Sequence, residues 1–261
     1  METDEFIEVL EREGQLLGEA ARIAGTGAPV PSCPAWRVRD LVAHTGVVHR
    51  FAARFVAEGL PARVPPPEEP GFDGDALLDW YRDGHRALVR TLTEAPPDVD
   101  CFAFLPAPTP LAFWARRQAH ETAVHRVDAE TAAGAGLSPF DAGFAADGID
   151  ELLAGFHSRP RSRVRTEVPY TLRVRTTDTS DVWTVHLTDD VPRTVRDGTG
   201  AADCELRGTA ADLYLALWNR PPVGTVGTTG DEAVARLWRE TSAITFGQPP
   251  HRSDQAKATD E

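Results

Sequence analysis

The chemistry of this chain is suggested first by a glutamate and a histidine four residues apart, Glu121 and His125. On a helix, side chains with this spacing lie on the same face, so a carboxylate oxygen and an imidazole nitrogen can point at one ion. Such a pair is half of a divalent-metal site. The spacing alone also fits a solvated helix face on which the two side chains interact only weakly.

Two neighbouring polar residues have different expected places. Asp128 lies three residues after His125 on the same stripe, where its carboxylate can accept a hydrogen bond from the imidazole and orient it. His120 directly precedes Glu121 and therefore points to another side of the helix.

A third metal ligand is expected from an earlier helix. His44 lies in the middle of the expected helix 38–58, close to its apolar stripe. A single histidine there is more often a packed residue than a ligand, and His44 becomes a candidate because Glu121 and His125 are present. His49 lies about 140° further round the helix, so it cannot easily share a small ion with His44. His85 has no evident partner and is interpreted as structural or solvent-facing.

Positioning these ligands requires a helical bundle. Four segments carry apolar residues at the helical period, namely 4–24, 38–58, 75–94 and a helix that begins at Thr109-Pro110 and ends before Gly134. Bundles build metal sites from side chains on facing helices, so ligands from the second and fourth helices are sterically sensible. A further helix is expected over 140–157, and a proline-rich connection over 60–74 can act as a crossover or a lid.

After residues 158–162 the hydrophobic period changes to two, which predicts strands at 170–175, 182–187, 193–196 and 204–207. Helices are expected at 209–218 and 231–241, with a loop over 224–230 between them. The fold class predicted is α+β with two domains: a helical bundle over 1–158, and a small α+β domain with an antiparallel sheet over 163–248. Residues 249–261 are polar and are expected to be disordered.

Composition limits the possible partners. The 261 residues carry a net charge of −13, which argues against nucleic acid or an anionic membrane as the general partner. No apolar run has the length of a membrane span and no secretory leader is evident, so a cytoplasmic protein is expected. Cys33, Cys101 and Cys204 suggest no disulfide framework. Cys33 precedes a helix that could stabilise its thiolate, or it is a small buried hydrophobe.

The stretches 30–44 and 120–130 together resemble the mycothiol-dependent maleylpyruvate isomerase family of actinobacteria, whose N-terminal domain is a DinB-like four-helix bundle. The stretch 207–220, followed by Gly230-Asp231, looks like the sterol-carrier-like C-terminal domain of that family. Two positions depart from it: family members often have glycine where Ala35 stands and an aromatic residue where Val127 stands. Neither position is a proposed ligand.

The resemblance implies a specific chemistry. It implies that His44, Glu121 and His125 hold a divalent metal, commonly zinc, with one coordination position open for water or a thiol. It also implies mycothiol as cosubstrate, with its sulfur adding to a small electrophile. Release of the thiol gives an isomerase, and retention gives an S-transferase. Arg220 matches a family arginine that could bind a substrate carboxylate in the cleft, although a surface arginine at a helix end is the alternative.

Two other functions fit the same residues. A metal with an open position can hydrolyse a substrate without any thiol, and a bundle can also serve only to bind a small molecule. The electrophile, the native metal and the choice between monomer and homodimer do not follow from the sequence.

Overall fold

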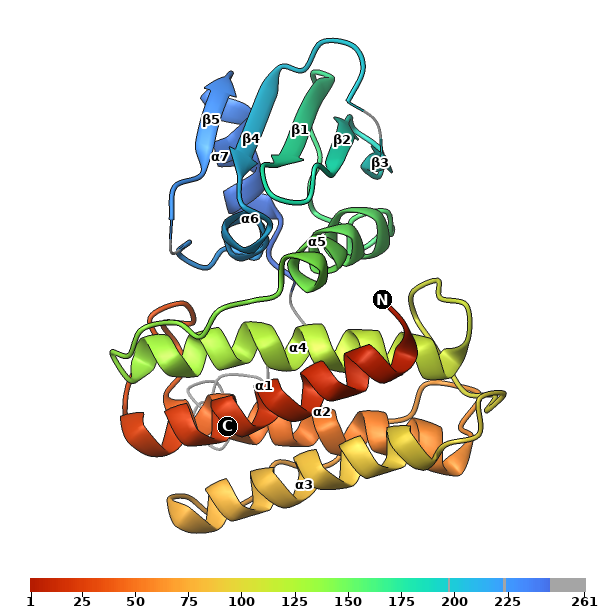
Figure 1. Cartoon of the computed structure of the whole chain (residues 1–261), viewed down its shortest axis with the longest axis vertical. Helices are drawn as coiled ribbons and strands as arrows, with labels where there is room; N and C mark the ends of the chain where they lie inside the picture. The colour runs from red at the N-terminus through yellow and green to blue at the C-terminus, as the bar shows by residue number, and fades with distance from the viewer. Residues whose placement is uncertain (197, 223, 245–261) are drawn as a thin grey trace, which may run out of the picture.

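The computed structural model describes residues 1–196, 198–222 and 224–244. These residues form two parts stacked along the long axis of the molecule, an all-helical part below and an α+β part above (Figure 1). The predicted α+β fold class with two parts is confirmed. The domain limits at 158 and 163 stay a prediction.

The lower part is a bundle of four helices: α1 (Thr3–Ala24), α2 (Val38–Glu58), α3 (Asp75–Glu94) and α4 (Pro110–Ala132). They lie where the apolar period predicted them. The helix ends also follow the expected signals. Thr109 accepts a hydrogen bond from the Ala112 backbone N–H at 3.1 Å and Pro110 occupies the first turn of α4, while Gly134 follows the end of α4 with φ of 66°.

Helix α4 has no solvent-facing side over most of its length, and every residue from 117 to 130 is buried. It packs against α1 and α2 within the bundle and lies beneath the upper part of the molecule (Figure 1). Its sequence is nevertheless rich in charged and polar residues. Because buried polar groups need partners, this helix must carry a network of ion pairs and hydrogen bonds.

The predicted helix over 140–157 forms in two pieces, α5 (Ala142–Asp150) and a π-helical turn, η1 (Glu151–Phe156). Helix α5 packs closely at Gly148, where an added Cβ would lie 2.4 Å from the Tyr214 ring and 2.8 Å from the His120 ring. Only glycine allows this approach. Glu151, the first residue of η1, is buried, and π-turns of this kind often occur at functional sites.

The upper part contains a five-stranded sheet formed by β1 (Tyr170–Thr176), β2 (Val182–Leu187), β3 (Arg193–Val195), β4 (Cys204–Gly208) and β5 (Gly227–Gly230). The strand order is β3-β2-β1-β4-β5. Helices α6 (Ala210–Leu217) and α7 (Glu232–Thr241) pack against it, with the fully buried Trp183, Leu213 and Trp238 in the core.

Two details of the predicted sheet were wrong. The sheet is mixed rather than antiparallel, because β1 and β4 pair in parallel. After the edge strand β3, the chain crosses to the far side of β1 before it forms β4, which brings β4 into the direction of β1. The segment expected to be a loop over 224–230 also contributes β5. The glycines at both ends of its Gly-Thr-Thr-Gly sequence disfavour a strand, and the segment pairs with β4 over its whole length.

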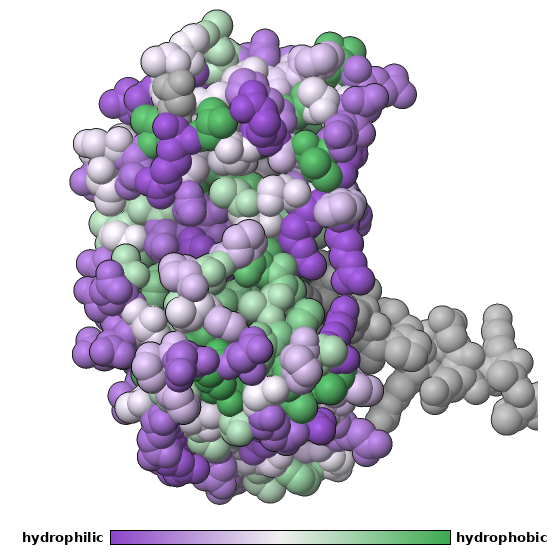
Figure 2. All heavy atoms as spheres, turned by 90° about the vertical axis from the view of Figure 1, so that its right-hand side faces the viewer, coloured by the Kyte–Doolittle hydropathy of each residue, from purple (hydrophilic) through white to green (hydrophobic). Residues whose placement is uncertain are grey.

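Figure 2 shows one face of the molecule, on which hydrophilic residues dominate both ends and apolar residues gather near the junction of the two parts. None of the described helices combines the length and the apolar character that a membrane span requires. The tail 249–261, which was expected to be disordered, lies outside the described residues.

Candidate metal centre

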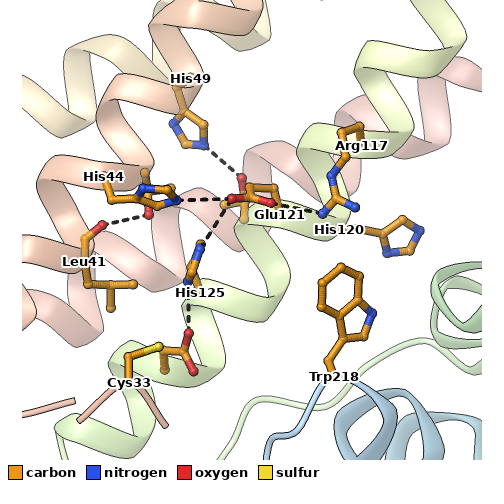
Figure 3. Close-up of polar contacts among 12 residues, drawn as sticks. Cys33, Leu41, His44, His49, Arg117, His120, Glu121, His125 and Trp218 are labelled. Atoms are coloured by element: carbon orange, nitrogen blue, oxygen red, sulfur yellow. Dashed lines mark hydrogen bonds and ion pairs between the residues drawn. The ribbon is translucent and has the colours of Figure 1, made fainter. Parts of the chain in front are cut away.

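The structure brings together the three residues that the sequence selected. His44 from α2 and Glu121 and His125 from α4 each offer one ligand atom, and these atoms lie within 4.8 Å of one another. Figure 3 shows the two imidazoles pointing at the Glu121 carboxylate. Both Nε2 atoms are 3.4 Å from the same oxygen, Oε1 of Glu121. The two rings meet edge to face, with centroids 5.2 Å apart.

This donor set fits a divalent cation. Two imidazole nitrogens and one carboxylate oxygen are typical of a zinc site with an open position. Ligands about 2.0–2.1 Å from a tetrahedral ion are separated by about 3.3 Å. The 3.4 Å between Oε1 and each Nε2 matches that spacing. The residues present therefore fit the metal that the sequence implied.

Asp128 fixes the orientation of His125. The Nδ1–H of His125 donates to Oδ2 of Asp128 at 2.9 Å, which leaves the Nε2 lone pair directed at the cluster. Burial by itself lowers the pKa of His125, but hydrogen bonds to Asp128 and Glu121 outweigh it and raise this pKa to about 9. In the absence of an ion, a proton on Nε2 therefore takes the place that a cation would occupy.

Arg220 reaches the same group from the other part of the chain. Its Nε and Nη2 donate to the two oxygens of Asp128 at 3.0 and 2.7 Å. The preceding residue, Asn219, has φ of 59°, a left-handed conformation that asparagine tolerates and that turns the chain at the end of α6. The family resemblance implied that Arg220 could reach the cleft and bind a substrate carboxylate, with a surface arginine at a helix end as the alternative. In the structure its charge is paired with Asp128.

Arg117 is a site residue that sequence reasoning missed. Its side chain is only 2% exposed, and its Nη2 donates to Oε2 of Glu121 at 3.2 Å while its Nη1 donates to Glu151 of η1. It thus holds the carboxylate oxygen of Glu121 that faces away from the histidines. The pKa of Glu121 would rise on burial, but His125, His44 and Arg117 together hold it well below its usual value. The available signal was the position of Arg117, four residues before Glu121.

Two models of one protein family match the chain. A family model described as the mycothiol maleylpyruvate isomerase N-terminal domain matches residues 8–130, and a model for the C-terminal domain of the same family matches residues 143–237. The chain belongs to the mycothiol maleylpyruvate isomerase family. It is therefore an enzyme of that family.

Solved structures share the fold. The crystal structure of the mycothiol-dependent maleylpyruvate isomerase superposes with a TM-score of 0.62 at 12% identity, covering 88% of this chain and 93% of that one. A histidine-to-alanine mutant of the same isomerase superposes with a TM-score of 0.61 at the same identity and coverage. At this identity the likeness shows the fold alone. No curated protein sequence matches the chain.

His44, Glu121 and His125 line a cavity of about 330 Å³ between the helical bundle and the α+β part of the chain. Both parts contribute to its walls. The lining residues are Ser32, Cys33, Pro34, Ala35, Trp36, His44, Arg117, Glu121, Val124, His125, Leu217, Trp218, Asn219, Arg220, Ser242, Ala243 and Ile244. The indole of Trp36 lies beside both histidines, with ring centroids 5.0 Å from His44 and 6.0 Å from His125.

The other histidines of the bundle lie outside the cluster. His120 points away from it, as expected, and its Nε2 is 2.9 Å from Oδ2 of Asp147 while its Nδ1 is 3.2 Å from the Tyr214 hydroxyl. His49 is buried and lies 2.8 Å from the Thr122 hydroxyl. His85 is buried and donates to the Leu10 carbonyl at 3.0 Å, which makes it structural.

The three cysteines are free. Cys33 lies in the wall of the cavity, half-buried, with its Sγ 4.0 Å from Nη2 of Arg220. Burial is the main cause that raises the pKa of Cys33, so the local environment does not stabilise its thiolate as one sequence interpretation suggested. Cys101 and Cys204 are buried away from the site.

Proposed function

We propose that this chain is a mycothiol-dependent metalloenzyme that acts on a small electrophile. The observation that carries the proposal is the convergence of His44, Glu121 and His125, which would hold a divalent cation, most simply zinc, at the floor of the cavity. A cation bound there would lower the pKa of a thiol at its open position and so supply a nucleophile at neutral pH. Family membership supports mycothiol as the source of that thiol.

The protein's own residues would hold this centre in one geometry. Asp128 fixes the tautomer of His125, and Arg117 holds the outer oxygen of Glu121, so one oxygen of that carboxylate faces the histidines. Because both positioning groups are almost fully buried, the three donor atoms have little freedom to move. The cavity walls would hold the reacting carbon of the substrate next to the sulfur.

Two reactions begin in the same way. In both, the sulfur forms a bond to an electrophilic carbon of the substrate. If the carbon–sulfur bond breaks again after rotation about a former double bond, the outcome is isomerisation and the thiol is regenerated. If a leaving group departs, or an opened ring takes up a proton, the thioether is retained and the outcome is S-transfer.

Metal analysis of purified protein tests the ligand assignment. We expect about one bound cation per chain in the wild type, in line with a three-residue site. His44→Ala should lose it, and His186→Ala, a half-buried histidine of β2, should retain it. Equal metal content in the His44→Ala protein would remove His44 from the site and end the proposal in this form.

Calorimetry and product analysis test the thiol. Binding of mycothiol to the metal-loaded protein should give a measurable heat. When an electrophile is then added, mass spectrometry should identify the product as a thioether or as an isomer of the electrophile. A hydrolysed product formed without mycothiol would support the metal-dependent hydrolase instead. Thiol binding without turnover of any electrophile would support the non-catalytic binding protein.

A further inference from the structure

We infer that the electrophile of this enzyme is uncharged and apolar, with a flat or aromatic face, rather than a carboxylate. This inference rests on the proposed function and names its substrate class. It follows from the way the charges around the cavity are paired and from the residues that make its walls.

Arg220 already neutralises a buried carboxylate, and three of its five N–H groups are engaged by protein acceptors. Its Nε and Nη2 donate to the two oxygens of Asp128, and its Nη1 donates to the Trp218 carbonyl at 2.8 Å. Asp128 is fully buried and the Arg220 side chain is only 14% exposed. A carboxylate that took Arg220 for itself would leave the charge of Asp128 buried beside His125, which is costly.

Arg117 is also paired with carboxylates of the protein. It lies between Glu121 and Glu151, and its guanidinium stacks near the rings of Phe156 and Trp218, at 5.0 and 5.5 Å from their centroids. Its Nε lacks a partner but is itself buried. A substrate carboxylate would have to compete with two carboxylates that are already in place.

The charges then balance without a substrate anion. Arg117 and Arg220 supply two positive charges, and Glu121, Asp128 and Glu151 supply three negative ones. A divalent cation would bring this group of charges to +1, and the thiolate of the cosubstrate would bring it to zero. A carboxylated electrophile would add an uncompensated negative charge beside the buried carboxylates Glu121, Asp128 and Glu151, which is unfavourable.

The walls favour an apolar molecule. Among the described residues, those that face the cavity around the ligand cluster include two indoles, Trp36 from the bundle and Trp218 from the end of α6. Pro34, Val124, Leu217 and Ile244 line it further. A volume of about 330 Å³ suits a small molecule with a single ring or a comparable flat group.

The described residues offer a second set of arginines, but these lie beyond the wall. Arg159, Arg161 and Arg163 line a separate cavity of about 370 Å³. That cavity shares Ala243 and Ile244 with the first one, so the two cavities adjoin at this segment. A carboxylate could use these arginines only if it extended past that segment.

Binding of unreactive probes to metal-loaded protein tests the inference. Dinitrobenzene and dinitrobenzoate differ by one carboxylate, and both quench indole fluorescence, for which Trp36 and Trp218 are placed in the walls. We expect dinitrobenzene to bind roughly tenfold or more tightly than dinitrobenzoate. The same order should hold for thioether formation from chlorodinitrobenzene and chlorodinitrobenzoate, each corrected for its uncatalysed rate with mycothiol. Equal or tighter binding of the carboxylated probe would overturn the inference.

Adding a positive charge at the edge of the cavity provides a second test. Ala243 is exposed at the cavity edge, so Ala243→Arg adds a cation without an ion-pair partner, and Ala243→Met adds comparable bulk without charge. Ala243→Arg should narrow or reverse the preference for the neutral probe, whereas Ala243→Met should preserve it. An identical preference in both variants would contradict the charge argument.

The basic cavity behind the wall provides the last control. If the wild type binds the carboxylated probe and an Arg159→Gln/Arg161→Gln variant does not, the two cavities act as one and the inference fails. Failure of the proposed function would look different, because the protein would then bind no metal or give no heat with mycothiol. Failure of the inference alone would leave both of those results intact.

Discussion

Removal of the Arg117 side chain should destabilise the metal-free protein strongly. In Arg117→Met the apolar volume is largely kept, but Glu121 and Glu151 lose their shared cation while their side chains stay only 10% and 2% exposed. Breaking one buried ion pair by deleting a partner costs about 3–5 kcal/mol. Because one arginine serves two carboxylates here, we expect a loss of about 4–5 kcal/mol in the free energy of unfolding.

Urea denaturation followed by circular dichroism, in the presence of a chelator, measures this loss. The matched control is Arg54→Met, which removes an exposed pair with Glu58 and should cost less than about 1 kcal/mol. Adding Glu151→Gln to Arg117→Met removes one of the two stranded charges and should restore about 1–3 kcal/mol. A loss below about 1 kcal/mol for Arg117→Met, with no recovery in the double variant, would refute the ion-pair reasoning.

Three further predictions concern the rest of the site and its support. In the metal-free protein the pKa of His125 is raised from 6.5 to about 9, so protonated His125 stabilises the fold fully below pH 6.5 and this stabilisation is lost as the pH rises through 9. The free energy of unfolding measured by denaturation at the two ends of that range should differ by about 3 kcal/mol. A free energy of unfolding that does not change with pH would contradict this prediction. Asp128→Asn should weaken metal binding about 10–100-fold in competition with a chelator, and unchanged affinity would show that the imidazole needs no anchor. Gly148→Ala should cost about 1–3 kcal/mol because the new methyl meets the rings of Tyr214 and His120, which a melting curve would detect, and an unchanged melting temperature would mean that α5 shifts freely.

The long helices followed from the sequence because their signals are local. An apolar stripe, a capping threonine and a following proline all act within one or two turns, and α4 begins at Pro110 after Thr109 as those signals require. The ligand pair Glu121 and His125 was accessible for the same reason, since the i and i+4 spacing is a property of one helix. His44 became a candidate only because Glu121 and His125 lie on another helix, and the family resemblance then implied it as a ligand, because spacing within α2 does not say which helix faces it.

The missed features depend on contacts that are distant in sequence. Arg117 and Glu151 are 34 residues apart, and Glu151 opens a π-helical turn, η1, that no local signal announced. Arg220 and Asp128 are 92 residues apart and belong to different parts of the chain. The parallel pairing of β1 with β4 likewise depends on where the chain crosses the sheet, which alternation of apolar residues cannot specify.

The partners of the buried charges explain why the proposed metal site needs both parts of the chain. The bundle supplies His44, Glu121 and His125, but its own Arg117 and Asp128 are buried charges beside those ligands. Glu151 and Arg220, which complete their ion pairs, both come from beyond the bundle helices. Without Arg220, Asp128 would stabilise the protonated form of His125 more strongly, which opposes the binding of a cation. Without Glu151, the charge of Arg117 would be paired with Glu121 alone. The upper part of the molecule therefore sets the electrostatics of the ligands as well as closing the cavity above them.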